Sequence, residues 1–160
     1  RREREDVHLE TMRQRAYRRT MVARLLPLLR SLFTPARENT TAEAIMNSLK
    51  NLADLDACLS DSNERSVFIF KHSTACPISS EAHRHVAKYA QSATEDDPQV
   101  YIVKVIEERP VSNQIADTLE LQHKSPQLIL VKDRQVLWSS SHYGINEQSI
   151  RDAITGHIAN

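Results

Sequence analysis

Residues 67–79 read VFIFKHSTACPIS, an apolar run followed by a polar loop, a cysteine and a proline. The run at 67–70 predicts a buried strand. Pro77 suits the first position of a helix, because its φ is preset and its missing N–H is not needed there. Cys76 would then precede a helix N-terminus, whose free N–H groups and partial positive charge favour a thiolate. The stretch therefore predicts a nucleophilic sulfur near neutral pH.

In a C-x-x-C redox pair the second thiol stands three residues after the first, and here Ser79 holds that place. Ser79 is a candidate hydrogen-bond partner for the thiolate, but its hydroxyl cannot form a disulfide. Cys58 is the other cysteine of the chain, within an apolar repeat (Leu52, Leu55, Cys58, Leu59) typical of the inner face of a helix. A core position is favoured for Cys58, because free cysteine is among the most buried residue types. A resolving role for it stays open.

The composition, with 160 residues, 40% hydrophobic content and two cysteines, suits one soluble domain without a disulfide framework. A reducing compartment is expected. The leucine-rich stretch at 25–33 is interrupted by Pro27 and Arg30, and no run of 18 apolar residues exists. Neither a membrane span nor a secretory signal is expected.

The charge is distributed unevenly along the chain. Residues 1–40 hold ten arginines, no lysine and five acids, whereas residues 41–160 hold eleven basic and sixteen acidic residues. We expect an Arg-rich extension at 1–45, partly helical or disordered, and a working domain at 46–160. The extension could bind an acidic surface, a membrane face or nucleic acid, or act as a transit peptide, but a poorly ordered segment is favoured.

Hydrophobic periodicity gives the expected order of elements in the working domain. A helix is predicted at 43–60, with a short strand at 47–51 as the alternative. The elements predicted after it are a strand at 66–70, a helix at 79–93, a strand at 100–106, a helix at 111–119, a hairpin of 128–131 and 135–138, and a last helix at 146–158.

This order, β-α-β-α-β-β-α with a cysteine at the first strand-to-helix junction, is the thioredoxin arrangement: an α/β fold with a central mixed sheet flanked by helices. Such folds place a cis-proline opposite the active cysteine, just before the third strand. Ser125-Pro126 occupies that position. A cis bond is therefore predicted before Pro126.

Four segments resemble one known family. Residues 70–79, FKHSTACPIS, are similar to the FKHST-x-CPIS signature of the monothiol bacilliredoxins of the YtxJ type. Residues 108–116 resemble the RP-x-SN-x-IA segment of that family, 123–127 its H-x-SPQ segment and 138–142 its W-x-x-SH segment. The resemblance spans about residues 46–160. Ala75 departs from it, at a position that is often threonine or arginine in the family.

The resemblance implies a monothiol thiol-disulfide oxidoreductase of the cytoplasm. Cys76 would remove bacillithiol from mixed disulfides on client proteins, with bacillithiol as co-substrate and a second low-molecular-weight thiol to restore the enzyme. No permanently bound cofactor, metal or nucleic-acid partner is implied.

The expected site has Cys76 as its catalytic residue, supported by Pro77, Ser79 and Pro126. Six further residues are candidates for supplying positive potential or for contacting the carboxylates or sugar of bacillithiol: Lys71, His72, Arg109, Asn113, Ser125 and His142. Each has a plainer alternative. Arg109 and Asn113 could cap a helix, with Ser112 helping to satisfy its free amides, His72 could pack at a strand end, and His142 could satisfy a loop.

Two other classes of function remain open. A C-x-x-S protein can hold an iron–sulfur cluster between subunits, although Pro77 and the lack of a glycine after Cys76 argue against this. Alternatively, oxidation of Cys76 could change a partner contact without turnover, as in a redox sensor. His83 and His85 lie two apart on a predicted helix and face apart, so no metal pair is expected there.

Overall fold

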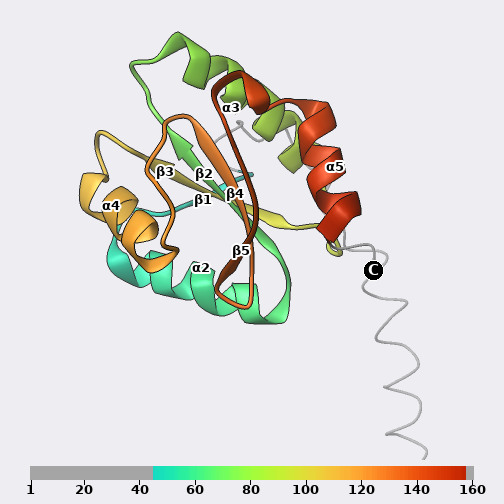
Figure 1. Ribbon diagram of the computed structural model, residues 1–160, viewed down its shortest axis with the longest axis horizontal. Coiled ribbons are helices and arrows are strands. Elements are labelled where there is room, and N and C mark those ends of the chain that lie inside the picture. The colour runs from blue at the N-terminus through green and yellow to red at the C-terminus, as the bar shows by residue number, and fades with distance from the viewer. Residues whose placement is uncertain (1–44, 158–160) are drawn as a thin grey trace, which may run out of the picture. The chain divides into compact units, whose positions relative to one another are not determined.

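The structure is a computed structural model that describes residues 45–157. The expected extension at 1–45 lies outside the described residues apart from Ile45. Figure 1 shows the described elements, whose bounds are β1 Asn47–Ser48, α2 Leu52–Glu64, β2 Val67–His72, α3 Pro77–Ser92, β3 Gln99–Lys104, α4 Arg109–Thr118, β4 Gln127–Lys132, β5 Gln135–Ser141, η1 His142–Gly144 and α5 Glu147–His157.

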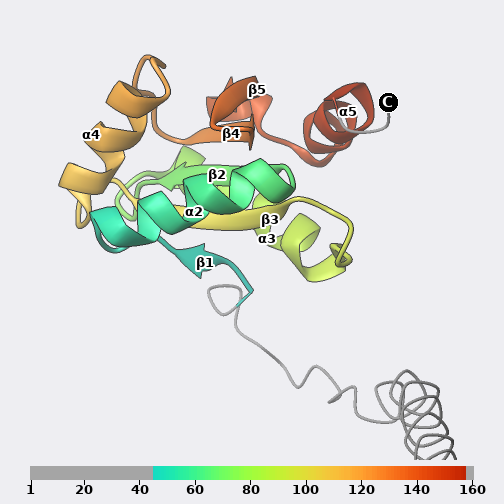
Figure 2. The ribbon, with the colours of Figure 1, turned by 90° about the horizontal axis from the view of Figure 1, so that it is seen from below.

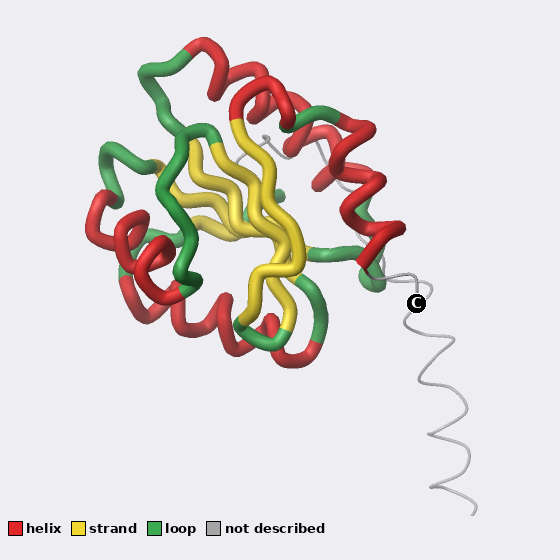
Figure 3. The backbone as a smooth tube through the Cα atoms, viewed as in Figure 1, coloured by secondary structure: helices red, strands yellow, loops and turns green. Residues whose placement is uncertain are grey.

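The five strands form one mixed sheet in the order β1-β3-β2-β4-β5 (Figure 3). β3 pairs in parallel with β1 and β2, while β4 pairs antiparallel with β2 and β5. In the centre, Phe70 of β2 lies between Ile102 of β3 and Leu128 of β4. Helices cover both faces, with α2 and α4 on one and α3 and α5 on the other (Figures 1 and 2). This is the predicted thioredoxin-like fold.

Two apolar cores flank the sheet because successive strand side chains point to opposite faces. Phe68 and Phe70 pack toward α3 and α5 with Val86 and Ile150. Val67 and Ile69 point the other way, toward α2 and α4. β2 is therefore apolar on both faces, as the continuous run at 67–70 indicated.

The predicted helix at 43–60 is wrong in its first half. Asn47 and Ser48 form β1, and α2 begins at Leu52. A reciprocal capping box fixes this start: Asp54 N–H donates to Asn51 Oδ1 at 3.0 Å, and Asn51 N–H donates to Asp54 Oδ2 at 3.2 Å. The alternative of a short strand near 47–51 is the correct one.

The inner face of α2 also differs slightly from the sequence prediction. Leu55, Cys58 and Leu59 are buried, but Leu52 is 53% exposed. Leu52 is the first residue of α2, and it lies at the edge of the buried face.

These two leucines allow a matched test of the packing of α2. Leu55→Ala should lower the free energy of unfolding by about 2–5 kcal/mol, because it leaves a cavity in the core. Leu52→Ala should change it by less than about 1 kcal/mol, because half of that side chain already contacts solvent. Urea unfolding of both variants measures the difference, and equal losses would contradict this packing of α2.

Candidate functional site

Cys76 is the N-cap residue of α3, with φ −117° and ψ 119°, and Pro77 follows it in the first turn. Its carbonyl accepts the Ser80 N–H at 3.0 Å, while its side chain makes no capping hydrogen bond. The thiol is half-buried. The sulfur therefore lies at the N-terminus of a 16-residue helix, the end that carries the partial positive charge of the helix dipole.

Ser79 holds the loop that carries Cys76. Its side chain is fully buried, and its Oγ accepts the Ser73 N–H at 2.9 Å. The same Oγ shares a hydrogen bond of 2.8 Å with Nδ1 of His72. The hydroxyl is thus engaged by the loop and by the end of β2, in place of the expected partnership with the thiolate.

His72 packs at the end of β2 instead of supplying positive potential. Its ring stacks on Phe70, with centroids 5.6 Å apart, and lies 4.9 Å from the ring of His83. Burial lowers the pKa of His72 below its usual value, and the charges of His83 and Lys104 lower it further. The imidazole is therefore neutral near pH 7, which favours the packing alternative for this residue.

The bond between Ser125 and Pro126 is cis, as predicted. Pro126 is buried, and the next residue, Gln127, pairs with Lys71 across the strands β4 and β2. The carbonyl of Pro126 accepts the His142 N–H at 3.1 Å, which joins η1 to the proline loop. β2 ends four residues before Cys76, so the cis-proline and the cysteine loop lie at the same end of the sheet.

The short helix η1 borders the site on the same side as the cis-proline loop. It contacts α3, the helix that Cys76 caps (Figure 1). His142 has a φ of 54°, in the left-handed region, and its side chain is exposed. The structure thus brings the predicted residues Ser125, Pro126 and His142 to the end of the sheet that holds Cys76.

The loop between β3 and α4 forms the other side. Thr74 Oγ1 donates to Glu107 Oε1 at 2.9 Å, and Val105 N–H donates to the His72 carbonyl at 2.8 Å. Arg109 and Asn113 are both exposed on the following helix, α4. The N-cap residue Glu108 makes no side-chain cap, and no hydrogen bond from Ser112 Oγ is present. Capping by Ser112 is therefore not observed.

Lys71 was predicted to contact the ligand, but the structure buries its side chain. Its side chain has no exposed surface, and its Nζ donates to the Ser112 carbonyl at 2.8 Å. The side chain points to the α2 and α4 face because His72, next along β2, points to the α3 face. Burial lowers the pKa of Lys71 to about 8, although the Asp117 carboxylate opposes this shift. A soluble ligand cannot reach an ammonium in this position.

Cys58 is a core residue, as favoured from the sequence. It is fully buried on α2, across the sheet from α3. Burial raises the pKa of the Cys58 thiol to about 12, and the charge of Asp61 adds to the shift. A protonated thiol on the opposite face of the sheet is unsuited to resolving a disulfide at Cys76.

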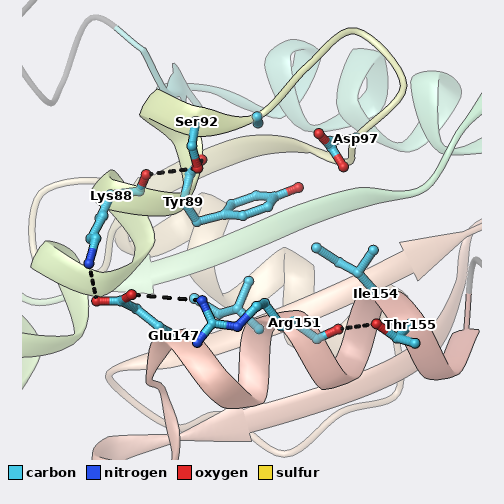
Figure 4. A pocket seen from close by; sticks show the side chains of 10 residues that line it. Lys88, Tyr89, Ser92, Asp97, Glu147, Arg151, Ile154 and Thr155 are labelled. Carbon is cyan, nitrogen blue, oxygen red and sulfur yellow. Dashed lines mark hydrogen bonds and ion pairs between the residues drawn. The ribbon is translucent and has the colours of Figure 1, made fainter.

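A groove of about 380 Å³ between α3 and α5 was not predicted from the sequence. Glu147 forms ion pairs with Lys88 at 2.7 Å and with Arg151 at 3.8 Å, and the side chain of Tyr89 also lines the groove (Figure 4). The groove follows the last turns of α3, so it lies away from Cys76, which caps the first turn. Glu147 forms ion pairs with both cations, and Asp97 is a second acid that lines the groove.

The fold and the site define a class of protein: a thioredoxin-fold protein with one half-buried thiol at a helix N-terminus, at the same end of the sheet as a cis-proline. A family model described as "Monothiol bacilliredoxin BrxC" matches residues 47–150. The chain belongs to this monothiol bacilliredoxin family, which implies a thiol redox function linked to bacillithiol.

Solved structures support the same fold. A thioredoxin-fold protein with 27% sequence identity matches with a TM-score of 0.61, over 72% of this chain and 98% of that one. Thioredoxin of Fasciola hepatica is 20% identical, with a TM-score of 0.57 over 70% and 99% of the two chains. Mitochondrial thioredoxin 3 of Saccharomyces cerevisiae is 18% identical, with a TM-score of 0.56 over 72% and 99%.

A membrane-crossing helix requires a long apolar segment. Within residues 45–157, no helix is long and apolar enough to qualify.

The role of Ser79 can be tested against that of its neighbour. Ser79→Ala should lower the free energy of unfolding by about 1–3 kcal/mol, because the part-buried Ser73 N–H and His72 Nδ1 lose their shared partner. Ser80→Ala is the control, since Ser80 is exposed and its Oγ makes one long hydrogen bond of 3.3 Å to the Cys76 carbonyl. Urea unfolding measures both. A loss for Ser80→Ala that matches the loss for Ser79→Ala would refute the loop-holding role.

The two thiols should differ in reactivity. Iodoacetamide should modify Cys76 in the folded protein and leave Cys58 unmodified, because Cys58 is buried and its thiol stays protonated. Intact mass should show one adduct under native conditions, two in concentrated urea, and none for folded Cys76→Ser. Modification of both cysteines at similar rates in the native protein would contradict this placement.

Proposed function

We propose that this chain removes bacillithiol from mixed disulfides on client proteins through Cys76. The observation that carries the proposal is the position of Cys76, the half-buried N-cap of α3 in a member of the monothiol bacilliredoxin family, with the second cysteine buried across the sheet. A single reactive thiol can exchange one disulfide for another but cannot close a disulfide within its own active site.

The exchange is balanced in bonds and electrons. The Cys76 thiolate attacks the bacillithiol sulfur of the mixed disulfide, a new S–S bond forms, and the client sulfur leaves as a thiolate that takes a proton from water. No net oxidation occurs, because one disulfide replaces another. A second low-molecular-weight thiol then attacks the Cys76 adduct, releases bacillithiol as a disulfide and restores the Cys76 thiolate.

The surrounding residues suit this exchange in different ways. Pro77 starts the helix that Cys76 caps, and Ser79 holds the loop. In thioredoxin folds the backbone beside the cis-proline can pair with the bound substrate, so Ser125 and Pro126 are proposed to orient the mixed disulfide.

Arg109, Asn113 and His142 are proposed to contact the ligand. All three side chains are exposed on elements that border the site. Arg109 carries the positive charge that suits the carboxylates of bacillithiol.

The decisive experiment combines intact mass with a client assay. After exposure to bacillithiol disulfide, the wild-type chain should gain the mass of one bacillithiol, and it should then release a client from a bacillithiolated model protein when a small thiol is present. Cys76→Ser should show neither, because no other accessible thiol exists, and Cys58→Ser should behave as wild type.

Three results would overturn the proposal. An adduct that persists in Cys76→Ser would place the chemistry at another residue. An adduct without multiple-turnover client release would indicate a redox sensor. Visible absorbance of the freshly purified protein would instead indicate an iron–sulfur protein.

A further inference from the structure

Lys71 is a buried cation that the exchange chemistry does not use. Its side chain has no exposed surface, and one of its three N–H donors binds the Ser112 carbonyl in the first turn of α4. Removing an ammonium from water costs free energy, so a buried lysine needs an interaction that offsets this cost. The contact joins β2, the strand that leads to Cys76, to α4, the helix that presents Arg109 and Asn113.

Gln127 lies beside Lys71 and holds a second element. The two residues are cross-strand partners of β2 and β4, so their side chains share a face of the sheet. Gln127 is 2% exposed, its Nε2 donates to the Gln122 carbonyl at 3.2 Å, and its Oε1 accepts the Lys124 N–H at 3.2 Å. Gln127 therefore fixes the loop at 122–126, which ends in the cis-proline.

The polar character of this interior region extends beyond those two side chains. Within residues 45–157, the two buried side-chain oxygens without a hydrogen-bond partner are Ser112 Oγ, on α4, and Ser125 Oγ, on the cis-proline loop. The charge of Lys71 also contributes, after burial, to lowering the pKa of His123 in the same loop. Lys71 thus contacts α4 directly and neighbours the cis-proline loop through its cross-strand partner Gln127.

We propose that Lys71 is a positioning residue of the exchange site, and that its ammonium and Gln127 form one buried clamp. The clamp fixes the first turn of α4 and the cis-proline loop against the strand that leads to Cys76. The inference rests on the proposed function, because it assigns the clamp to the two walls that would orient a mixed disulfide.

The geometry predicts which kinetic parameter the clamp controls. Its hydrogen bonds end on the two walls, whereas the hydrogen bonds of Ser79 and Thr74 that hold the loop of Cys76 involve neither Lys71 nor Gln127. Loosening the walls should weaken the binding of the mixed disulfide and leave the intrinsic reactivity of the sulfur unchanged.

Lys71→Met tests the clamp, because methionine has an unbranched side chain that is one atom shorter than that of lysine and lacks both the charge and the donors. The KM for a bacillithiolated model client should rise about tenfold, as expected for the loss of a hydrogen bond from a charged donor, with kcat little changed. The rate of Cys76 alkylation by iodoacetamide should stay the same. Lys132→Met is the matched control, since Lys132 Nζ also donates to a backbone carbonyl, that of Asn63, but at the other end of β4.

Gln127→Leu provides a second route to the same result, should Lys71→Met fail to fold. It should raise KM in the same way. The double variant should lose less than the sum of the two single losses, because the two residues act as one unit. Unchanged KM in both single variants, additive losses in the double variant, or an equal rise for Lys132→Met would overturn the clamp.

Hydrogen exchange tests the clamp independently of the proposed function. The Lys124 amide, which donates to Gln127 Oε1, should exchange faster in Lys71→Met than in wild type and should be unaffected in Lys132→Met. If the wild-type chain releases no bacillithiol, the proposed function fails, and this measurement still decides the clamp. Unaltered exchange of Lys124 in Lys71→Met would refute the coupling between the two residues.

Discussion

The pairing of β2 with strands on both sides is the constraint on which the site depends. Parallel pairing with β3 and antiparallel pairing with β4 bring the end of β3 and the start of β4 to the end of β2. The loop with Cys76 therefore lies at the same sheet end as the β3–α4 loop and the cis-proline. A shift of one residue in either ladder would turn Phe70 out of its core and Lys71 into it.

Successive side chains of β2 point to opposite faces of the sheet, so the neighbouring polar residues Lys71 and His72 make different contacts. His72 points to the α3 face, where it binds Ser79 and helps to hold the cysteine loop. Lys71 points to the opposite face, where it binds α4. Both had been expected to face a ligand, because they stand close to Cys76 in the sequence. Lys71 is buried against α4, which presents the exposed Arg109 and Asn113, whereas the part-buried His72 is bonded to the cysteine loop.

Sequence reasoning succeeded where a local signal is strong. The proline after Cys76, the apolar run at 67–70 and the Ser125-Pro126 step each indicated a feature that the structure contains. It failed at 43–60, because the apolar spacing there continues through β1, whereas the capping box at Asn51 starts α2 afresh. The burial of Lys71 had no local signal, since it depends on α4 supplying a carbonyl 41 residues further along the chain.

The sequence by itself determined the type of chemistry: a lone cysteine before a helix-starting proline, a serine in place of a second thiol, and motifs that point to one family. Tertiary structure alone decided which residues surround that cysteine. It placed Cys58 and Cys76 on opposite sides of the sheet, and it buried the side chain of Lys71. The physical reason is that local preference sets the start of a helix, whereas strand register and helix packing, which join distant segments, set the burial of a side chain.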